Sequence, residues 1–425
     1  MIPHKTKFVN PDAQQNIKNR TLQTFSALKH RNFRLFWTGQ LISLIGTWMQ
    51  TVAQGWLVLQ LTNSAFLLGA VNAIGSVPVL LFALPGGVIA DRLEKRKILL
   101  FTQIVAMSLA FILAALTHLH NTGVLVLKVW YVAAIAAVGG SVFALDVPAR
   151  QSFFIEMVGK KDLLNAIALN SAIFNAARIV GPALAGILIG VVGTASCFFL
   201  NGLSFVAVII GLLLIRIDAP AIKKSDSPWD DMKQGLRYAW NYKAVRALVL
   251  IVALFSIFGM PYVVLMPIFA RDILNKGAGG LGFLMAATGS GALVGSLVLA
   301  SFSQIQKKGI LVFWAGIIFS LATLVFSLSR NYVLSLAILP LVGLSMVSQV
   351  ATVNTMIQST VSDQMRGRVM GVFTMMFMGM MPFGSFIAGS IAARWGAPFA
   401  LQLGAGICFC ATVIIYKLVP DLWRM

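Results

Sequence analysis

The segment from Gly87 to Lys97, which lies between two long apolar stretches, combines side chains that could make a charge-based switch. Asp91 follows an uncharged apolar run, and Arg92 and Arg96 come directly after it. An acid placed where hydrocarbon meets water, beside cations, can form an ion-pair latch on one membrane face. Gly87 would let a neighbouring helix approach closely. The alternative is that the cations only anchor the chain at the membrane surface.

A second acid and one deep cation extend this chemistry. Asp146 ends another apolar run, on the same side as Asp91, and with Asp91, Arg92 and Arg96 it is expected to close an inner gate. Its alternative role is to cap the following turn. Arg178 would lie about 20 Å along a helix from Asn165 at 1.5 Å per residue, too deep for an interfacial anchor. We expect its partner to be a carbonyl, Asn175, water or an anionic substrate.

Small residues and a proline follow Arg178 in the same apolar run. Gly181, Pro182 and Gly186 permit close helix packing, and the proline removes a backbone donor and bends the helix. This pattern predicts a hinge or a seal on the outer side. A packing kink without a gating role is the alternative.

Polar side chains recur at helical spacing in two otherwise apolar segments. The first stripe consists of Gln40, Ser43, Thr47, Gln50 and Gln54, and the second of Ser345, Ser348, Thr352, Thr355 and Ser359, with Gln349 and Asn354 beside it. Polar groups at membrane depth must face protein or water. We therefore expect Gln50, Gln54, Thr352 and Asn354 to line a cavity. Hydrogen bonding between helices is the alternative.

Two further residues are candidate contacts for an apolar cargo. Tyr262 offers a stacking surface, and Met375 belongs to a methionine-rich segment whose flexible thioethers fit irregular ligands. Core or lipid-facing packing is the alternative for both.

The elements that must position these residues are membrane-spanning helices. The chain of 425 residues is 58% hydrophobic and 11% charged, whereas soluble domains carry about a quarter charged residues. A spanning helix needs about 20 apolar residues. We predict an all-α polytopic membrane protein with twelve transmembrane helices, near residues 36–60, 67–90, 98–118, 124–146, 165–190, 194–216, 245–270, 280–304, 310–328, 332–358, 369–392 and 397–418.

The net charge of +20 is distributed unevenly along this pattern. If the first residue is cytosolic and the spans alternate, 27 of the 33 Lys and Arg fall on the cytosolic side. Such asymmetry follows the positive-inside rule, so we expect both termini in the cytosol and no nucleic-acid partner. The polar, basic first 35 residues lack the apolar core of a signal peptide.

The sequence offers no enzyme chemistry. Cys197, Cys408 and Cys410 lie in apolar runs, and no Cys/His spacing predicts a metal. We find no nucleophile beside a base, no paired carboxylates at depth and no phosphate-binding Gly-Lys loop. We therefore expect neither enzymatic activity nor a cofactor.

The chain divides into two halves around a polar stretch. The predicted order is a cytosolic tail with an interfacial helix, a six-helix bundle, a cytosolic linker, a second six-helix bundle and a short cytosolic tail, at residues 1–35, 36–216, 217–244, 245–418 and 419–425. The halves also echo each other. A shift of 213 residues brings Gly69 onto Gly282, and a shift of 203 brings Gly186 onto Gly389. The two bundles are therefore predicted to be repeats with a site at their interface.

The segment from Gly87 to Arg96 resembles the signature loop between helices two and three of the major facilitator superfamily, except that Glu94 replaces a usual glycine. The Gly-Pro pair at 181 resembles the helix-five motif of facilitator antiporters. Several segments are similar to the bacterial branch that contains the enterobactin (siderophore) exporter, namely 28–34, 61–64, 146–151, 165–186 and 234–238.

This resemblance implies secondary efflux across the bacterial inner membrane, driven by protons, through alternating rocking of two bundles. It implies a monomer in the lipid bilayer and a small-molecule substrate such as a siderophore, with the first and fourth helices of each half lining the cavity. The deep cation Arg178 favours an anionic or neutral amphipathic cargo. A broad multidrug exporter and a membrane receptor or scaffold without transport remain the alternatives.

Overall fold

A computed structural model describes residues 25–216, 228–301 and 307–424. Within these ranges a few side chains lie outside the description, namely those of Ala83, Leu84, Val88, Asp91 and residues 228–231. Every regular element in the described ranges is a helix. The N-terminal half comprises η1 (Ser26–Lys29), α2 (Arg31–Thr62), α3 (Ala65–Arg92), α4 (Lys95–Asn121), α5 (Val129–Val191) and α6 (Thr194–Leu214).

The C-terminal half follows helix α7 (Pro228–Asn241), which lies within the predicted linker. It comprises α8 (Lys243–Leu254), η2 (Phe255–Gly259), α9 (Tyr262–Ile268), η3 (Phe269–Ile273), α10 (Gly277–Ser301), α11 (Lys308–Leu328), α12 (Tyr332–Thr360), α13 (Asp363–Met378), α14 (Met381–Trp395), α15 (Ala397–Leu418) and η4 (Pro420–Arg424).

Ten helical segments in the described residues are long and apolar enough to cross a membrane. One of them, α5, is 63 residues long and breaks at Gly159, whose φ of 70° suits glycine, so it contains two spans. Helix α2 has 32 residues but is not among the ten, because its polar stripe lowers its hydropathy. With α2 and the divided α5, the helices correspond one to one with the twelve predicted spans.

The local boundaries differ from the predictions at both ends of the first half. The described part of the predicted interfacial helix is a four-residue 3-10 turn, Ser26–Lys29, and α2 begins directly after it at Arg31. The fourth span begins at Val129 rather than 124 and continues beyond Asp146 to the Gly159 break. Asp146 therefore does not end a helix. It lies about 20 Å before the break at 1.5 Å per residue and is buried.

Two spans of the C-terminal half are interrupted. The seventh changes from α8 through π-helical turns at η2 and η3, and it contains Pro261 and Pro267. The eleventh stops at Gly379 and resumes at Met381 as α14. Proline and π-helical turns are common causes of such bends.

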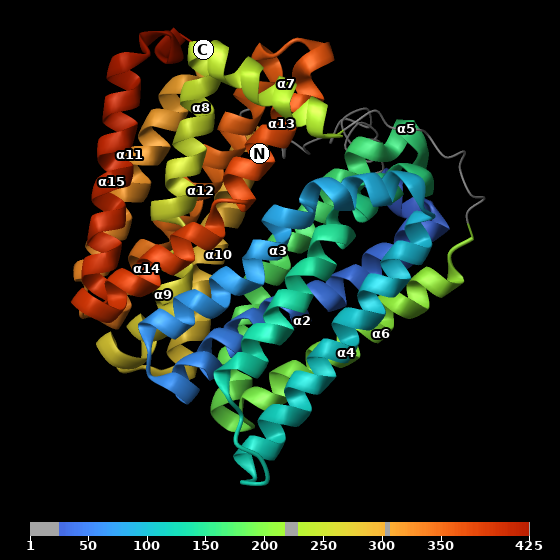
Figure 1. Cartoon of the computed structure of the whole chain (residues 1–425), viewed down its shortest axis with the longest axis vertical. Coiled ribbons are helices and arrows are strands. Elements are labelled where there is room, and N and C mark those ends of the chain that lie inside the picture. The colour runs from blue at the N-terminus through green and yellow to red at the C-terminus, as the bar shows by residue number, and fades with distance from the viewer. Residues whose placement is uncertain (1–24, 217–227, 302–306, 425) are drawn as a thin grey trace, which may run out of the picture.

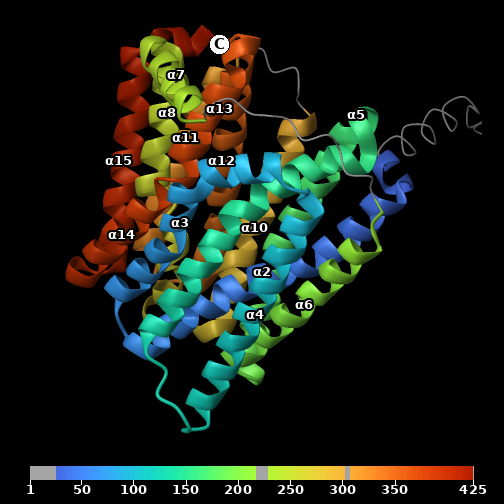
Figure 2. The same ribbon diagram turned by 45° about the vertical axis from the view of Figure 1, so that its right-hand side comes forward.

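Helices α2–α6 form one bundle and α8–α15 form a second (Figures 1 and 2). The bundles converge where α3 begins beside α14 and α5 ends beside α10, which we name the closed end. They diverge toward the basic end, which holds the Gly159 turn, α7 and the cations at 95–97, 160–161 and 307–308, although α3 still reaches α7 and α13 there.

The hydrophobic packing follows the same division. One core cluster joins all five helices of the N-terminal bundle, α2–α6, to the helices of the second bundle. A separate cluster, which includes Phe33, Phe36, Phe153 and Phe154, holds only the N-terminal bundle together at its basic end. The two bundles therefore share a core toward the closed end and have independent packing at the basic end.

Candidate functional site

A cavity of about 540 Å³ lies against the N-terminal bundle. Its walls come from α2, α3, α4, α5 and α6, and Met378 is its lining residue from the second bundle. All five residues of the first polar stripe line it, namely Gln40, Ser43, Thr47, Gln50 and Gln54. Asn72, Ser76, Gln103, Asp146, Arg150, Gln151, Asn170 and Asn201 add further polar groups. The cavity is thus rich in carboxamides and contains one carboxylate and one guanidinium.

Helix α2 presents its stripe to this cavity with part of its hydrogen-bonding capacity unused. Gln50 Oε1 accepts a hydrogen bond from Asn201 Nδ2 at 2.7 Å, which ties α2 to α6. Thr47 Oγ1 donates to the carbonyl of Ser43 at 2.9 Å. Gln40 Oε1 and Gln103 Oε1 are buried and have no hydrogen-bond partner among the described residues. Both oxygens could accept a hydrogen bond from a polar ligand or from water.

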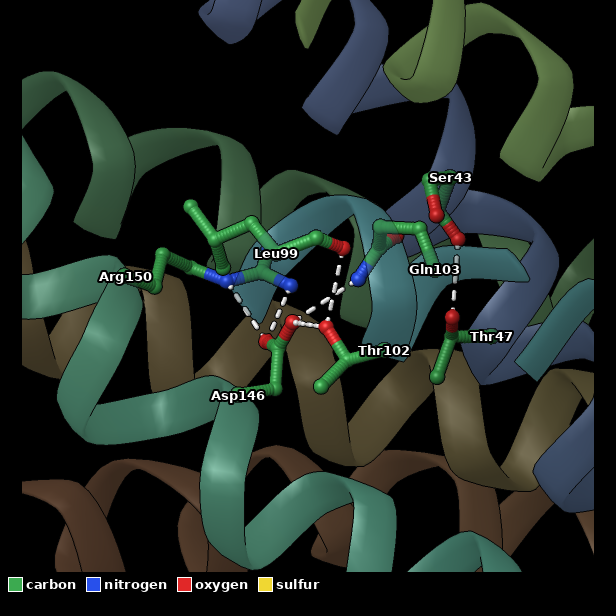
Figure 3. A network of polar contacts seen from close by, with 7 residues as sticks. All are labelled: Ser43, Thr47, Leu99, Thr102, Gln103, Asp146 and Arg150. Carbon is green, nitrogen blue, oxygen red and sulfur yellow. Dashed lines mark hydrogen bonds and ion pairs between the residues drawn. The ribbon is translucent and has the colours of Figure 1, made fainter. Parts of the chain in front are cut away.

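Asp146 is the centre of a buried network on this cavity (Figure 3). Its Oδ1 accepts hydrogen bonds from Thr102 Oγ1 and Gln103 Nε2, each at 2.8 Å. Its Oδ2 accepts from Arg150 Nε at 2.9 Å and also contacts Arg150 Nη2. The whole Asp146 residue is only 5% exposed. Its carboxylate is therefore held by one cation from α5 and by two neutral donors from α4.

Asp146 and Arg96, two members of the expected gate, each have other partners in this structure. Asp146 pairs with Arg150, as described above. Arg96 instead donates to the carbonyls of Leu212 at 2.7 Å and Leu213 at 2.9 Å, and so caps the last turn of α6. Arg92 is exposed, and the Asp91 side chain lies outside the described part of the chain.

Sequence reasoning missed one ion pair beside this loop. Lys95 Nζ lies 3.2 Å from Glu156 Oε1, and the two side chains are only 16% and 12% exposed. The pair joins the first turn of α4 to α5 before its break. Glu156 belongs to no recognisable sequence motif. Only its position relative to Gly159 and the rotation of its helix explain why it forms an ion pair.

The closely packed glycine of this region is Gly86 rather than Gly87. A Cβ added to Gly86 would lie 2.6 Å from the carbonyl oxygen of Ala144 on α5. A Cβ added to Gly87 would have no neighbour within 4 Å. Gly86 is therefore one of the glycines at which α3 packs closely on α5, in addition to the contact of Gly75 with Gly140, and this corrects the expectation for Gly87.

The second stripe, on α12, is buried at Ser345, Ser348 and Thr352 and exposed at Thr355 and Ser359. Thr352 is 4% exposed, does not line the cavity, and its Oγ1 has no partner among the described residues. Asn354 Oδ1 accepts from Gln358 on the same helix and also does not line this cavity. Tyr262 is fully buried, and Met375 is absent from the cavity wall, where Met378, one turn further along α13, is present.

Arg178 is held between the two bundles. Its guanidinium lies 5.7 Å from the centre of the Trp48 ring on α2. Its Nη2 is 4.0 Å from the sulfur of Met346 on α12, and it interacts electrostatically with the Tyr262 hydroxyl. None of the ion pairs formed by the described residues includes Arg178.

The helix-five motif packs against both bundles near the closed end. Asn175 donates to the carbonyl of Ser171 on its own helix at 2.9 Å. A Cβ on Gly181 would lie 2.6 Å from Trp48 Cβ, and one on Gly186 would lie 3.0 Å from the Cα of Gly282. The carbonyl oxygen of Pro182 would be 2.4 Å from a Cβ on Gly282. The motif thus lets α5 touch α2 and α10 with almost no side chain between them.

A polar contact adds to this closure. Arg271 of η3 donates through Nη1 to Asn63 Oδ1 at 2.7 Å and to the carbonyl of Leu59 at 3.1 Å. Asn63 has a φ of 47°, the left-handed conformation that ends α2, so its side chain projects toward the second bundle. The closed end is therefore fastened by backbone contacts and by one charged group.

Comparisons with known proteins agree with this architecture. A family model described as transmembrane secretion effector matches residues 22–422. The staphyloferrin A transporter of Staphylococcus aureus is 24% identical over 385 residues, which cover 90% of this chain and 95% of that protein. The multidrug efflux pump Tap of Mycolicibacterium fortuitum is 27% identical over 361 residues, which cover 83% of this chain and 87% of that protein. The crystal structure of the nucleoside transporter NupG has a TM-score of 0.70 at 12% identity, covers 94% of this chain and 99% of that one, and shares the fold.

Proposed function

The chain belongs to the transmembrane secretion effector family of the major facilitator superfamily, and from this membership we propose that it exports a small amphipathic molecule such as a siderophore. It is an efflux transporter of the major facilitator type and not an enzyme. The proposed mechanism is alternating access, in which the two bundles rock about the site between them.

The observation that carries this proposal is the arrangement of the cavity relative to the closed end. A cavity of about 540 Å³ is lined by the five polar residues of the α2 stripe, and the two bundles contact each other through glycines at the closed end. The bundles diverge toward the basic end. A carrier needs a solvated site that is accessible from one side at a time, and this arrangement supports such a site.

Two relatives support different cargoes. The relative named as a staphyloferrin A transporter supports a siderophore as the cargo. The carboxamide-rich cavity wall suits such a molecule. The multidrug pump Tap supports broad drug export as the second candidate, and Met378 at the cavity wall gives that candidate a flexible apolar contact.

For energy coupling we favour proton antiport with Asp146 as the proton carrier. Asp146 is a buried carboxylate on the cavity wall, and its ion-pair partner Arg150 lines the same cavity. A carboxylate that exchanges its cationic partner for a proton or a substrate group can couple two binding events. Asp91 is the other candidate at a span end, in the loop that resembles the superfamily signature.

The proposed location is the bacterial inner membrane, with both termini and the basic end in the cytosol. The excess of Lys and Arg at the basic end supports this orientation. The bacterial relatives support the location. In this orientation the described state is accessible from the cytosol and closed toward the outside.

The export of cargo can be tested by comparing culture supernatants. Strains with and without the gene would be grown under iron limitation, and the secreted molecules compared by mass spectrometry. We expect an iron-chelating compound to be depleted from the supernatant of the deletion strain and to accumulate in its cells. If the secreted profiles are identical and the deletion strain is instead sensitive to unrelated drugs, the multidrug alternative replaces the siderophore proposal.

Transport itself can be separated from a receptor or scaffold role by cysteine accessibility. In a background with the exposed Cys410 replaced by serine, Gln54→Cys should react with a water-soluble maleimide, because Gln54 lines the cavity. Thr352→Cys is the matched control and should stay unreactive in the described state. A scaffold without a water-filled cavity would leave both thiols unreactive.

A further inference from the structure

Arg178 and Tyr262, which come from opposite bundles, both direct a hydrogen-bond donor at one weak acceptor. Arg178 Nη2 is 4.0 Å and the Tyr262 hydroxyl is 3.8 Å from the sulfur of Met346. A thioether is a poor acceptor, whereas a guanidinium carries five N–H donors and binds carboxylates through paired bonds. These two donors therefore converge on a thioether rather than on an anionic oxygen.

Arg178 has no anionic partner among the described residues. It interacts with the neutral hydroxyl of Tyr262, and its remaining contact is the face of Trp48, which stabilises a cation but accepts no conventional hydrogen bond. A cation at membrane depth without a counter-charge in the protein is a functional candidate.

The backbone holds this cation in a fixed position beside the cavity. A Cβ on Gly289 of α10 would lie 2.9 Å from the carbonyl oxygen of Arg178, so α10 packs directly on this turn of α5. Phe174, one turn earlier on α5, lines the cavity and packs edge-on against Trp48 at 5.6 Å. A molecule in the cavity is thus separated from the guanidinium by one helical turn.

We propose that Arg178 and Tyr262 form a site for the carboxylate, or a similar anionic oxygen group, of the transported molecule. The anionic group takes the place of the Met346 sulfur, which can move because its side chain is unbranched and flexible. The cargo class is therefore an organic anion with an apolar or hydrogen-bonding body in the cavity. This inference rests on the proposed transport function and adds the charge of the substrate to it.

The site has a consequence for the transport cycle. Its two donors belong to different bundles, Arg178 to α5 and Tyr262 to α9. An anion that accepts from both is bound most tightly when the bundles hold these side chains together. Occupancy of the site would therefore bias the equilibrium between the two arrangements of the bundles.

The test uses a matched pair of probes, 1-pyrenebutyrate and the neutral 1-pyrenebutyramide, with the full-length protein in lipid nanodiscs and empty nanodiscs as the blank. Binding is followed by pyrene fluorescence. The wild-type protein should bind the carboxylate about tenfold more tightly than the amide, as a charge-assisted hydrogen bond implies. Arg178→Gln should remove this preference, because the affinity for the carboxylate falls much more than the affinity for the amide.

Three further variants make the result specific. Arg178→Lys keeps the charge and should keep part of the preference. Met346→Leu removes the sulfur but not the volume, and it should keep the full preference. Arg394→Gln is the matched control, since Arg394 also lies over a tryptophan, Trp395 at 5.0 Å, but far from the cavity wall.

The inference is overturned if wild type binds both probes equally, or if Arg178→Gln keeps the carboxylate preference. If Arg178→Gln does not fold, Tyr262→Phe is the deciding variant, because it should reduce the preference for the carboxylate over the amide. Uptake into inside-out vesicles separates this inference from the transport proposal. If the amide is taken up along the gradient but the carboxylate is not preferred in binding, only the anion site is overturned. If the carboxylate is preferred in binding but neither probe is taken up, only the transport proposal is overturned.

Discussion

Gly69 on α3 and Gly389 on α14 lie back to back at the closed end, so that a Cβ added to Gly69 would be 2.8 Å from the Cα of Gly389. Gly186 on α5 and Gly282 on α10 make the corresponding contact at 3.0 Å. The sequence echo relates Gly69 to Gly282 and Gly389 to Gly186. Each repeat therefore contributes one glycine from its second helix and one from its fifth, and the two crossings are related by the pseudo-symmetry of the halves.

Gly186→Val should open the closed end. The added side chain would meet the backbone of α10, and overpacking of this kind costs about 1–3 kcal/mol, which shifts a two-state equilibrium about 5- to 150-fold. The protein can escape this cost by separating the bundles. Spin labels at Val126 and Val333, which are exposed and lie in different halves, should then show longer distances in pulsed EPR.

Gly190→Val is the control for this experiment, because Gly190 lies one turn further along α5 and an added Cβ there has no neighbour within 4 Å. It should leave the distance distribution unchanged. If both valine variants shift the distances equally, the glycine crossing is not what fastens the closed end.

Asp146→Asn should reduce both stability and proton coupling. The Arg150 side chain is only 17% exposed, and removing the carboxylate leaves its guanidinium without its ionic partner. Breaking a buried pair costs about 3–5 kcal/mol. Thermal unfolding in detergent should therefore begin at a lower temperature, and pH-driven transport in inside-out vesicles should be lost.

The double variant Asp146→Asn with Arg150→Gln separates these two effects. It removes both charges, so stability should return toward wild type while proton-driven transport stays absent. Recovery of coupling in the double variant would show that Asp146 only balances the charge of Arg150 and carries no proton.

Gly86→Val and Gly87→Val should differ although the residues are neighbours. The first places a side chain against the backbone of α5 at Ala144 and should destabilise the N-terminal bundle by about 1–3 kcal/mol. The second meets open space and should leave the unfolding temperature unchanged. If the two variants lose stability equally, the assignment of the close contact to Gly86 is contradicted.

The sequence predicted the twelve spans well because hydropathy and charge asymmetry are properties of whole segments. The α2 stripe was also predictable, since Gln50 and Gln54 recur at helical spacing in an apolar segment, where such polar groups must face protein or water. The hydroxyl groups of α12 recur at the same helical spacing, but there the spacing does not indicate a cavity. Ser345 and Thr355 donate to carbonyls one turn earlier, at Leu341 and Ala351, and need no cavity.

The partners of the charged residues could not be predicted, because they depend on how each helix is rotated. Asp146 and Arg150 are four residues apart and share a helix face, but Thr102 and Gln103 join them only through the packing of α4 on α5. Arg96 was expected to bind an acid and instead binds two carbonyls at the end of α6. One helical turn also separates the predicted Met375 from the observed Met378.

The contact that docks η1 onto α5 should depend on pH. Asp162, three residues past the Gly159 break and outside the two spans of α5, accepts hydrogen bonds from His30 Nε2 at 2.8 Å and Ser26 Oγ at 2.7 Å. These hydrogen bonds lower the pKa of the Asp162 carboxyl below its ordinary value of 3.8, and the bond from His30 has the largest effect. Because the docked state binds the proton more weakly, docking is favoured at pH values above the ordinary pKa and is lost as the pH falls through the lowered one.

A spin label at the exposed Lys29 can follow this docking at any pH. We expect an immobilised spectrum at pH 7 and pH 5 and a mobile one only well below pH 4. Asp162→Asn should give the mobile spectrum at all three pH values, because it removes the carboxylate that both donors share. A label that stays immobilised in Asp162→Asn at pH 7 would show that the buried Ala27 and its bond to Asn165, rather than the charge on Asp162, hold the turn in place.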